Sequence, residues 1–138
     1  MSRQAITRDL VVSLTKALKM PGLARSSEAL ARRGKEEKWS YDEYLYEALL
    51  AEHNSRTESA IRHRIHEARF PEMKTLDTFD FDATEGAIAP PAIAELARCD
   101  WVSRTENVIL AGSIGTGKTH LAIGLGIEAA KLRMRVSF

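Results

Sequence analysis

A glycine-rich run near the end of the chain has the residue types needed to bind a polyphosphate. It fits the pattern G-x-x-x-x-G-K-[ST] at every fixed position. Its glycines permit backbone angles and close approaches that a Cβ would obstruct, so backbone N–H groups can point at an anion. A lysine ammonium and a threonine hydroxyl complete the set of groups for phosphate and Mg²⁺. The run consists of Gly112, Ser113, Ile114, Gly115, Thr116, Gly117, Lys118 and Thr119.

The residues on either side favour the strand, turn and helix order that a phosphate loop requires. Residues 107–111 are apolar and rich in β-branched side chains, which predicts a buried parallel strand. A helix beginning in the run would add the partial positive charge of its dipole. We therefore expect a nucleoside triphosphate to bind here, with Lys118 at the β- and γ-phosphates and the Thr119 hydroxyl on Mg²⁺. The apolar residues at helical spacing after the run are Leu121, Ala122, Leu125, Ala129 and Leu132.

Composition is that of an ordinary soluble globular protein. The 138 residues are 44% hydrophobic and 28% charged, which is the size and balance of one average domain. Cys99 is the single cysteine, which excludes an internal disulfide, and we expect it to be a packed helix residue. His63 and His66 lie three residues apart, but no third ligand is near them, so no metal site is predicted. No apolar run approaches the roughly 18 residues that span a bilayer. We expect a cytoplasmic protein with no signal peptide and no membrane span.

The first 75 residues predict a helical domain for contact with partners or DNA. Apolar spacing predicts helices over residues 7–19 and 23–37. Ser40 and Glu43 have the spacing of a capping box, so a third helix should cover residues 41–70. Apolar side chains in the first half of this helix should pack against the first two helices. They are Tyr41, Tyr44, Leu45, Ala48 and Leu49.

The second half of the third helix is basic, and its candidate contact residues are Arg62, Arg64 and Arg69. The formal charge is +3 through residue 75 and −2 over the remainder. One interpretation is a solvated helix whose charge is balanced by neighbouring acids. The other is a basic arm that contacts DNA phosphates or an acidic partner. The balancing acids would be Glu52, Glu58 and Glu67.

A connector over residues 76–82 marks the predicted domain boundary, which divides the chain into residues 1–75 and 76–138. Its two aromatic residues, Phe79 and Phe81, either anchor the connector to a core or approach the adenine ring of a nucleotide. Prolines at 90 and 91 suit the first turn of a further helix.

The predicted fold class is α+β, with a helical N-terminal domain followed by the start of a P-loop α/β nucleotide-binding domain. Residues 135–138 resemble the start of a second strand, and the predicted domain is cut off there. Two strands cannot bury both faces of a doubly wound sheet. We therefore expect the chain to be the front portion of a longer protein. It has no later acidic strand end and no arginine suited to a neighbour's γ-phosphate, so hydrolysis is not assigned to this segment and no catalytic residue is predicted.

Five segments in a fixed order carry a family resemblance. They are residues 16–23 (KALKMPGL), 44–50, 68–81 (with ARFP and KTLDTFDF), 107–111 and 115–122 (GTGKTHLA). Together they resemble the IstB-type helper ATPases of bacterial DNA transposition, which are relatives of the DnaC helicase loaders in the AAA+ group. A phosphate loop is common to many NTPases, so the specificity comes from the combination.

The resemblance implies a helical domain that contacts partners, joined to an AAA+ module that binds ATP and Mg²⁺, forms homo-oligomers and engages DNA. Similar proteins act beside a transposase. Family members commonly have proline where this loop has Ser113 or Ile114, and those positions contribute mainly backbone. Two alternatives remain besides a transposition helper. One is a replicative helicase loader, in which the basic helix meets a helicase. The other is a plain ATP-binding module or an inactive, truncated remnant.

Overall fold

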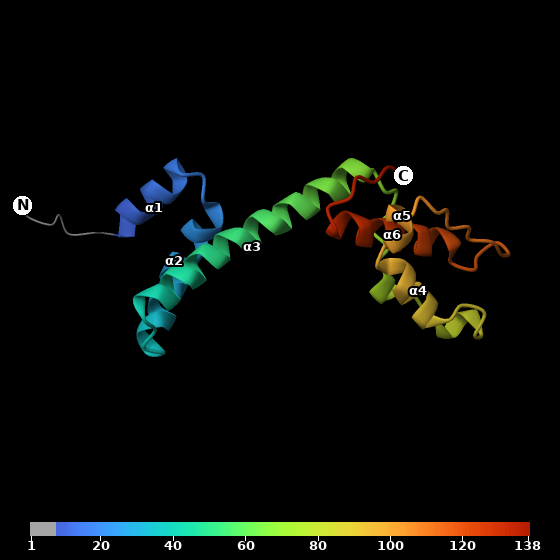
Figure 1. The fold of residues 1–138 in the computed structure, drawn as a ribbon, viewed down its shortest axis with the longest axis horizontal. Helices are drawn as coiled ribbons and strands as arrows, with labels where there is room; N and C mark the ends of the chain where they lie inside the picture. The colour runs from blue at the N-terminus through green and yellow to red at the C-terminus, as the bar shows by residue number, and fades with distance from the viewer. Residues whose placement is uncertain (1–7) are drawn as a thin grey trace, which may run out of the picture. The chain divides into compact units, whose positions relative to one another are not determined.

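The structure is a computed structural model, and it describes residues 8–138 (Figure 1). The chain forms two compact units, Met1–Ser59 and Ala60–Phe138. The predicted start of the first helix at Thr7 lies outside the described residues. A functional division between residues 75 and 76 remains a prediction.

The first unit is built from helices close to those that the sequence predicts. They are α1 (Arg8–Ala17), α2 (Pro21–Glu36) and the first part of α3 (Tyr41–Ala68). The predicted capping box is present at the start of α3. The Ser40 N–H donates to Glu43 Oε2 over 2.6 Å, and the Glu43 N–H donates to Ser40 Oγ over 3.2 Å. These two bonds satisfy donors that a helix start leaves unpaired, so α3 begins where the sequence places it.

A close contact joins α2 to α3 around a buried carboxylate. A Cβ on Gly22 would lie only 2.5 Å from Cβ of Ser55, so only glycine fits there. Glu52 accepts hydrogen bonds from the Leu23 N–H over 3.0 Å and from Nε of Arg56 over 2.8 Å. Burial alone would raise the pKa of Glu52, but these hydrogen bonds outweigh it and hold the pKa below its usual value. Glu52 therefore caps the N-terminus of α2 from a different helix.

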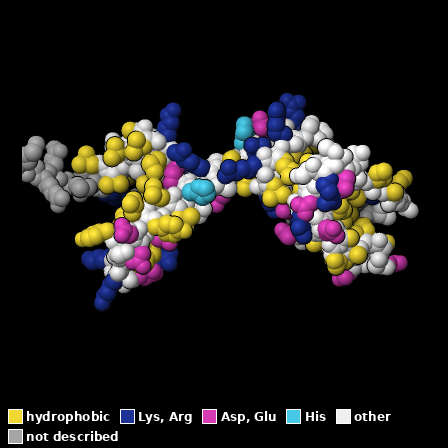
Figure 2. Space-filling model, viewed as in Figure 1, with side chains coloured by type: hydrophobic (Ala, Val, Ile, Leu, Met, Phe, Trp, Pro, Cys, Tyr) yellow, Lys and Arg dark blue, Asp and Glu magenta, His cyan; other side chains and the backbone are white. Residues whose placement is uncertain are grey.

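The predicted packing face of α3 is largely wrong. Ala48 is buried and Tyr44 is half-buried, but Tyr41 is 95% exposed and Leu45 and Leu49 are also exposed. The reason is that α2 approaches α3 along small and polar residues rather than along its large apolar ones. Hydrophobic side chains consequently gather at the surface of this unit (Figure 2). The exposed ones are Leu10, Val11, Leu14, Leu18, Tyr41, Leu45, Tyr46 and Leu49.

The second unit contains the end of α3 and five further helical elements. These are the short η1 (Leu76–Thr78) and η2 (Asp82–Thr84), α4 (Pro90–Ala97), α5 (Asp100–Ser103) and α6 (Lys118–Lys131). The prolines occupy the first turn of α4, as expected. A buried apolar cluster lies between the connector, α4 and α6. It consists of Phe79, Ile93 and Leu121, with Leu76, Phe81, Ile88, Leu96 and Leu110 packed against it.

Helix α6 is the most deeply buried element of this unit, and its glycines admit neighbouring side chains. A Cβ on Gly124 would lie 2.5 Å from Cδ2 of Leu76, and one on Gly126 would lie 2.8 Å from Cζ of Phe70. Cys99 is packed, with 1% of it exposed, but it lies between α4 and α5 and not inside a helix as predicted. Burial raises the pKa of its thiol, which does not suit a nucleophile. The connector is thus fixed against the helix that follows the glycine-rich run.

The prediction of an α+β fold is wrong, because residues 8–138 contain helices and no β-strand. Residues 107–111 and 135–138 have no regular secondary structure, and no backbone hydrogen bond joins one segment to the other. An extended segment becomes a strand only when a neighbour supplies the ladder of hydrogen bonds. Ile109, predicted to be buried in a strand, is 86% exposed. No helix in the same described part is both long and apolar enough to cross a membrane.

Candidate nucleotide-binding site

The glycine-rich loop lies between an extended segment and α6, and its backbone angles require glycine. Gly115 and Gly117 have φ of +82° and +85°, in the left-handed region that other residues rarely adopt. Gly117 is also the N-cap of α6, and no side chain caps this helix. The helix therefore begins directly at Lys118, as the motif predicts.

The first turn of α6 has backbone donors that the helix itself does not use. The first intrahelical bond runs from the Leu121 N–H to the Gly117 carbonyl over 2.9 Å. The N–H groups of Lys118, Thr119 and His120 precede it, so they have no carbonyl four residues earlier within the helix. With no capping side chain in competition, these donors and the helix dipole form an environment that favours an anion.

The Lys118 ammonium is folded into the loop. Its Nζ donates to the Gly112 carbonyl over 2.9 Å and to the Ser113 carbonyl, and it lies 3.4 Å from Oγ1 of Thr116. Thr116 Oγ1 in turn donates to the Ser113 carbonyl over 2.9 Å. The cation of the predicted site is therefore held by carbonyl groups of the glycine loop. A polyphosphate would exchange neutral carbonyl acceptors for charged phosphate oxygens, which are stronger partners for an ammonium.

Phe79 packs against the backbone of the glycine loop. Its ring carbon Cε2 would lie 2.6 Å from a Cβ on Gly117, so the ring and the loop backbone are in close contact. The ring is 9% exposed, and it makes edge contacts to Phe81 at 4.8 Å and to His120 at 5.2 Å between centroids. Of the two roles weighed for the connector aromatics, Phe79 has that of an anchor in the core.

His120 ties the connector to the first turn of α6, a role that the sequence pattern did not suggest. Its Nε2 lies 2.7 Å from the carbonyl oxygen of Thr75 and 3.3 Å from Oγ1 of Thr78. A carbonyl only accepts, so Nε2 carries the proton and donates. Thr78 Oγ1 also donates to the Thr75 carbonyl over 3.0 Å. The sequence analysis included His120 only as part of residues 115–122 in the family resemblance, and it predicted no role for this side chain.

Two cavities adjoin the loop. One of about 660 Å³ extends from the loop to the connector and α4, and it is lined by Phe79, Ile88, Ile93 and the extended segment before the loop. The other, of about 430 Å³, is lined by residues 115–120 and by Pro71, Glu72 and Lys74 from the segment that follows α3. Both share Gly115, Thr116, Gly117, Lys118 and His120. Among the predicted loop residues, Ser113, Ile114, Thr116 and Thr119 are exposed, whereas Gly117 and Lys118 are half-buried.

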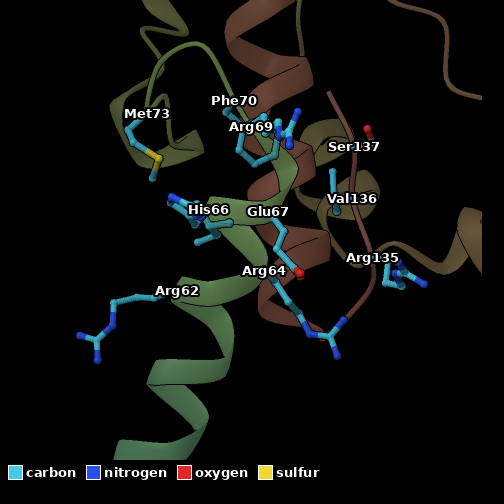
Figure 3. A pocket seen from close by; sticks show the side chains of 11 residues that line it. Arg62, Arg64, His66, Glu67, Arg69, Phe70, Met73, Arg135, Val136 and Ser137 are labelled. Carbon is cyan, nitrogen blue, oxygen red and sulfur yellow. The ribbon is translucent and has the colours of Figure 1, made fainter.

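A separate basic surface surrounds the end of α3, and we call it the arginine cluster (Figure 3). Arg62, Arg64 and Arg69 line one shallow cavity of about 1220 Å³, together with His66 and with Arg135 from the segment after α6. In Figure 3, Arg62 extends to one side of the helix and Arg64 to the other, as expected for residues two apart. Arg135 is therefore a basic residue of this surface that the sequence did not predict.

Two of the three acids expected to balance these arginines pair with other residues. Glu52 pairs with Arg56 over 2.8 Å, and Glu67 lies 3.4 Å from Nε2 of His63. The choice between a solvated helix and a basic arm for the second half of α3 remains a prediction.

Comparison with known proteins identifies a family that covers most of the chain. Residues 13–138 match the family described as IstB-like ATP binding protein. A Pseudomonas aeruginosa protein named as an ATP-binding protein of insertion sequence IS21 is 42% identical over 91% of this chain and 47% of its own length. A Geobacillus stearothermophilus protein with that designation for IS5376 is 37% identical over 81% of this chain and 44% of its own. A Bacteroides fragilis protein named as an IS21-like ATP-binding protein is 36% identical over 83% of this chain and 57% of its own length.

The chain spans about half the length of the curated relatives that it matches. The resemblance inferred from five sequence segments is confirmed, because the match covers the helical front, the connector and the glycine loop together. The chain belongs to the family of IstB-like ATP-binding proteins.

Proposed function

We propose that the chain binds ATP with Mg²⁺ at the loop of residues 112–119 and acts as an ATP-binding helper of DNA transposition. The observation that carries this proposal is the Lys118 ammonium, held by the Gly112 and Ser113 carbonyls beside the uncapped start of α6. A cation and unpaired N–H donors at one point suit a polyphosphate. The relatives named for insertion sequences support the role in transposition.

Each part of the proposed site has a distinct task. The N–H groups of the first turn of α6 orient the phosphates, and Lys118 moves from loop carbonyls to phosphate oxygens. The exposed Thr119 hydroxyl supplies an oxygen ligand for Mg²⁺, which neutralises phosphate charge when bound. Phe79 and His120 hold the loop and the helix start in place through the contacts described above.

The partners that we propose are DNA, a transposase and further copies of this chain. The arginine cluster supports the contact with DNA, because guanidinium groups bind phosphate oxygens in bidentate geometry. The exposed apolar side chains of α1 and α3 support association with another protein surface. The names of the relatives favour a role in transposition over the loading of a replicative helicase. We propose that this role is carried out in the cytoplasm.

Titration with a fluorescent ATP analogue tests the nucleotide part of the proposal. In the presence of Mg²⁺, the chain should bind the analogue saturably, and unlabelled ATP should displace it. AMP should displace it far less well, because the proposed contacts are made mainly to the β- and γ-phosphates. Absence of saturable binding, or equal displacement by AMP, would contradict a polyphosphate site at this loop.

A further inference from the structure

The segment that follows α3 places two further charged side chains beside the glycine loop. The cavity of about 430 Å³ is lined by Gly115, Thr116, Gly117, Lys118 and Thr119 on one side. On the other side it is lined by Glu72 and Lys74, more than forty positions earlier in the chain. The predicted motif includes neither residue, so this cavity has a cation and an anion for which the motif has no role.

The position of Lys74 is fixed by its neighbour. The carbonyl of Thr75 accepts the 2.7 Å hydrogen bond from His120, which lies in the first turn of α6. The η1 turn that follows is held by Leu76 against Gly124 of the same helix. Lys74 is therefore one residue from a point attached directly to the helix that begins with Lys118. This attachment keeps the Lys74 ammonium within reach of the cavity.

The partner of Lys74 in this structure is easily exchanged. Its Nζ lies 3.0 Å from Oε2 of Glu72, and the two side chains are 43% and 65% exposed, respectively. An ion pair this exposed contributes little to stability, because water and salt screen it. A polyphosphate in the cavity carries several negative charges and would compete successfully with one carboxylate for the ammonium.

We propose that Lys74 is a second phosphate-binding cation of this site, and that Glu72 competes with the nucleotide for it. This inference rests on the proposed ATP site. Lys74 then adds attraction for the polyphosphate, while Glu72 reduces it by pairing with Lys74 and by repelling phosphate. The two residues of one ion pair therefore have opposite effects on ATP affinity, which a purely structural pair would not have.

The test measures the Kd for MgATP by displacement of a fluorescent analogue from four variants of the chain. Lys74→Ala should weaken binding about fivefold to tenfold, which corresponds to one screened contact between charges. Lys74→Arg should retain most of the affinity, because it keeps the positive charge. Glu72→Gln should strengthen binding about threefold. Lys131→Ala is the matched control, since Lys131 also pairs with a glutamate, Glu128, at the far end of α6, and it should change nothing.

The outcomes separate this inference from the proposed function. If the unmodified chain does not bind MgATP, both are overturned. If it binds and Lys74→Ala binds equally well, only the role of Lys74 is overturned. Equal weakening by Lys74→Ala and Glu72→Gln would show a structural ion pair and would also overturn it. Thermal unfolding of each variant accompanies the titration. If Lys74→Ala unfolds at a lower temperature, its Kd no longer tests the proposal, and the Kd of Glu72→Gln is used in its place. Unchanged or weaker binding of MgATP by Glu72→Gln would then contradict the proposal.

Discussion

The ring of Phe79 occupies the space beside Gly117 where any other residue would place its Cβ, with Cε2 only 2.6 Å from that position. Gly117 also has φ of +85°. Two independent constraints thus act on one residue of the phosphate loop, a backbone angle and a close aromatic neighbour. Gly115 has nearly the same φ, +82°, but nothing lies within 4 Å of its Cβ position.

This difference predicts unequal effects of alanine at the two glycines. Gly115→Ala should lower the free energy of unfolding by about 1–2 kcal/mol, the cost of a left-handed angle. Gly117→Ala should lower it by about 2–4 kcal/mol, because the clash with Phe79 adds to that cost. Urea unfolding followed by tryptophan fluorescence measures both. Equal losses would show that the Phe79 contact does not constrain the loop.

Glu52 predicts a pH dependence in the first unit. Its pKa in the folded chain lies below the usual value, because Arg56 and the N–H groups at the start of α2 stabilise the carboxylate against burial. A group whose pKa is lower in the folded than in the unfolded chain stabilises the fold. This contribution is fully present above the pKa of the unfolded chain, about 4.3, and is lost as the pH falls through the pKa of the folded chain. Folding stability should therefore decrease on acidification below about pH 4.5.

Glu52→Gln isolates this contribution from those of other acids. The variant should lose about 1–2 kcal/mol near pH 7 and should lose less than the unmodified chain on acidification. Glu106→Gln is the control, since Glu106 also has a lowered pKa through Arg104 but is exposed and belongs to the second unit. Circular dichroism during urea unfolding, at pH values from 7 to about 3, gives the curves. Parallel curves for the Glu52→Gln variant and the unmodified chain would be inconsistent with Glu52 as the cap of α2.

The arginine cluster predicts how DNA binding depends on salt. If Arg62, Arg64 and Arg69 contact phosphates, replacing all three with alanine should weaken binding to duplex DNA. It should also reduce the slope of log K against log [salt] by up to about 2.7, or about 0.9 for each lost phosphate contact. Fluorescence anisotropy with a labelled duplex at several salt concentrations measures both quantities.

A matched triple variant controls for the loss of net charge. Arg98, Arg104 and Lys131 belong to the same unit and pair with Asp100, Glu106 and Glu128 at 3.1, 2.9 and 2.6 Å, respectively. Their replacement by alanine removes the same number of charges but should leave the salt slope close to that of the unmodified chain. If both triple variants reduce the slope alike, the effect is one of net charge, and the cluster is not a specific DNA surface.

Local signals explain which parts of this structure the sequence predicted. The Ser40–Glu43 capping box and the proline at the start of α4 act within one helical turn, and both helices begin where these signals lie. The glycine loop followed directly by α6 is another local pattern, and it was predicted residue by residue. By contrast, the contact of His120 with Thr75 joins residues 45 positions apart. No short motif encodes such a contact, so the role of His120, and the contacts on which the proposal for Lys74 rests, came only from the structure.

The missing strands have a different physical cause. Residues 107–111 have the composition of a buried strand, but composition describes only one of the two partners that a ladder needs. In the described residues no second segment bonds to them, and Ile109 stays exposed. The packing face of α3 was mispredicted for a related reason. Helical periodicity shows which residues share a face, whereas the neighbour that covers a face is set by tertiary contacts such as Gly22 against Ser55.

The affinity of Lys118→Ala for MgATP tests the central claim most directly, with Lys131→Ala measured beside it. Both variants remove one ammonium from α6, but only Lys118 lies in the glycine loop. Since a hydrogen bond to a charged group contributes about 1.5–3 kcal/mol, Lys118→Ala should weaken binding roughly 100-fold, while Lys131→Ala should leave Kd unchanged. Equal affinity of both variants and the unmodified chain would contradict the assignment of this loop as the ATP site.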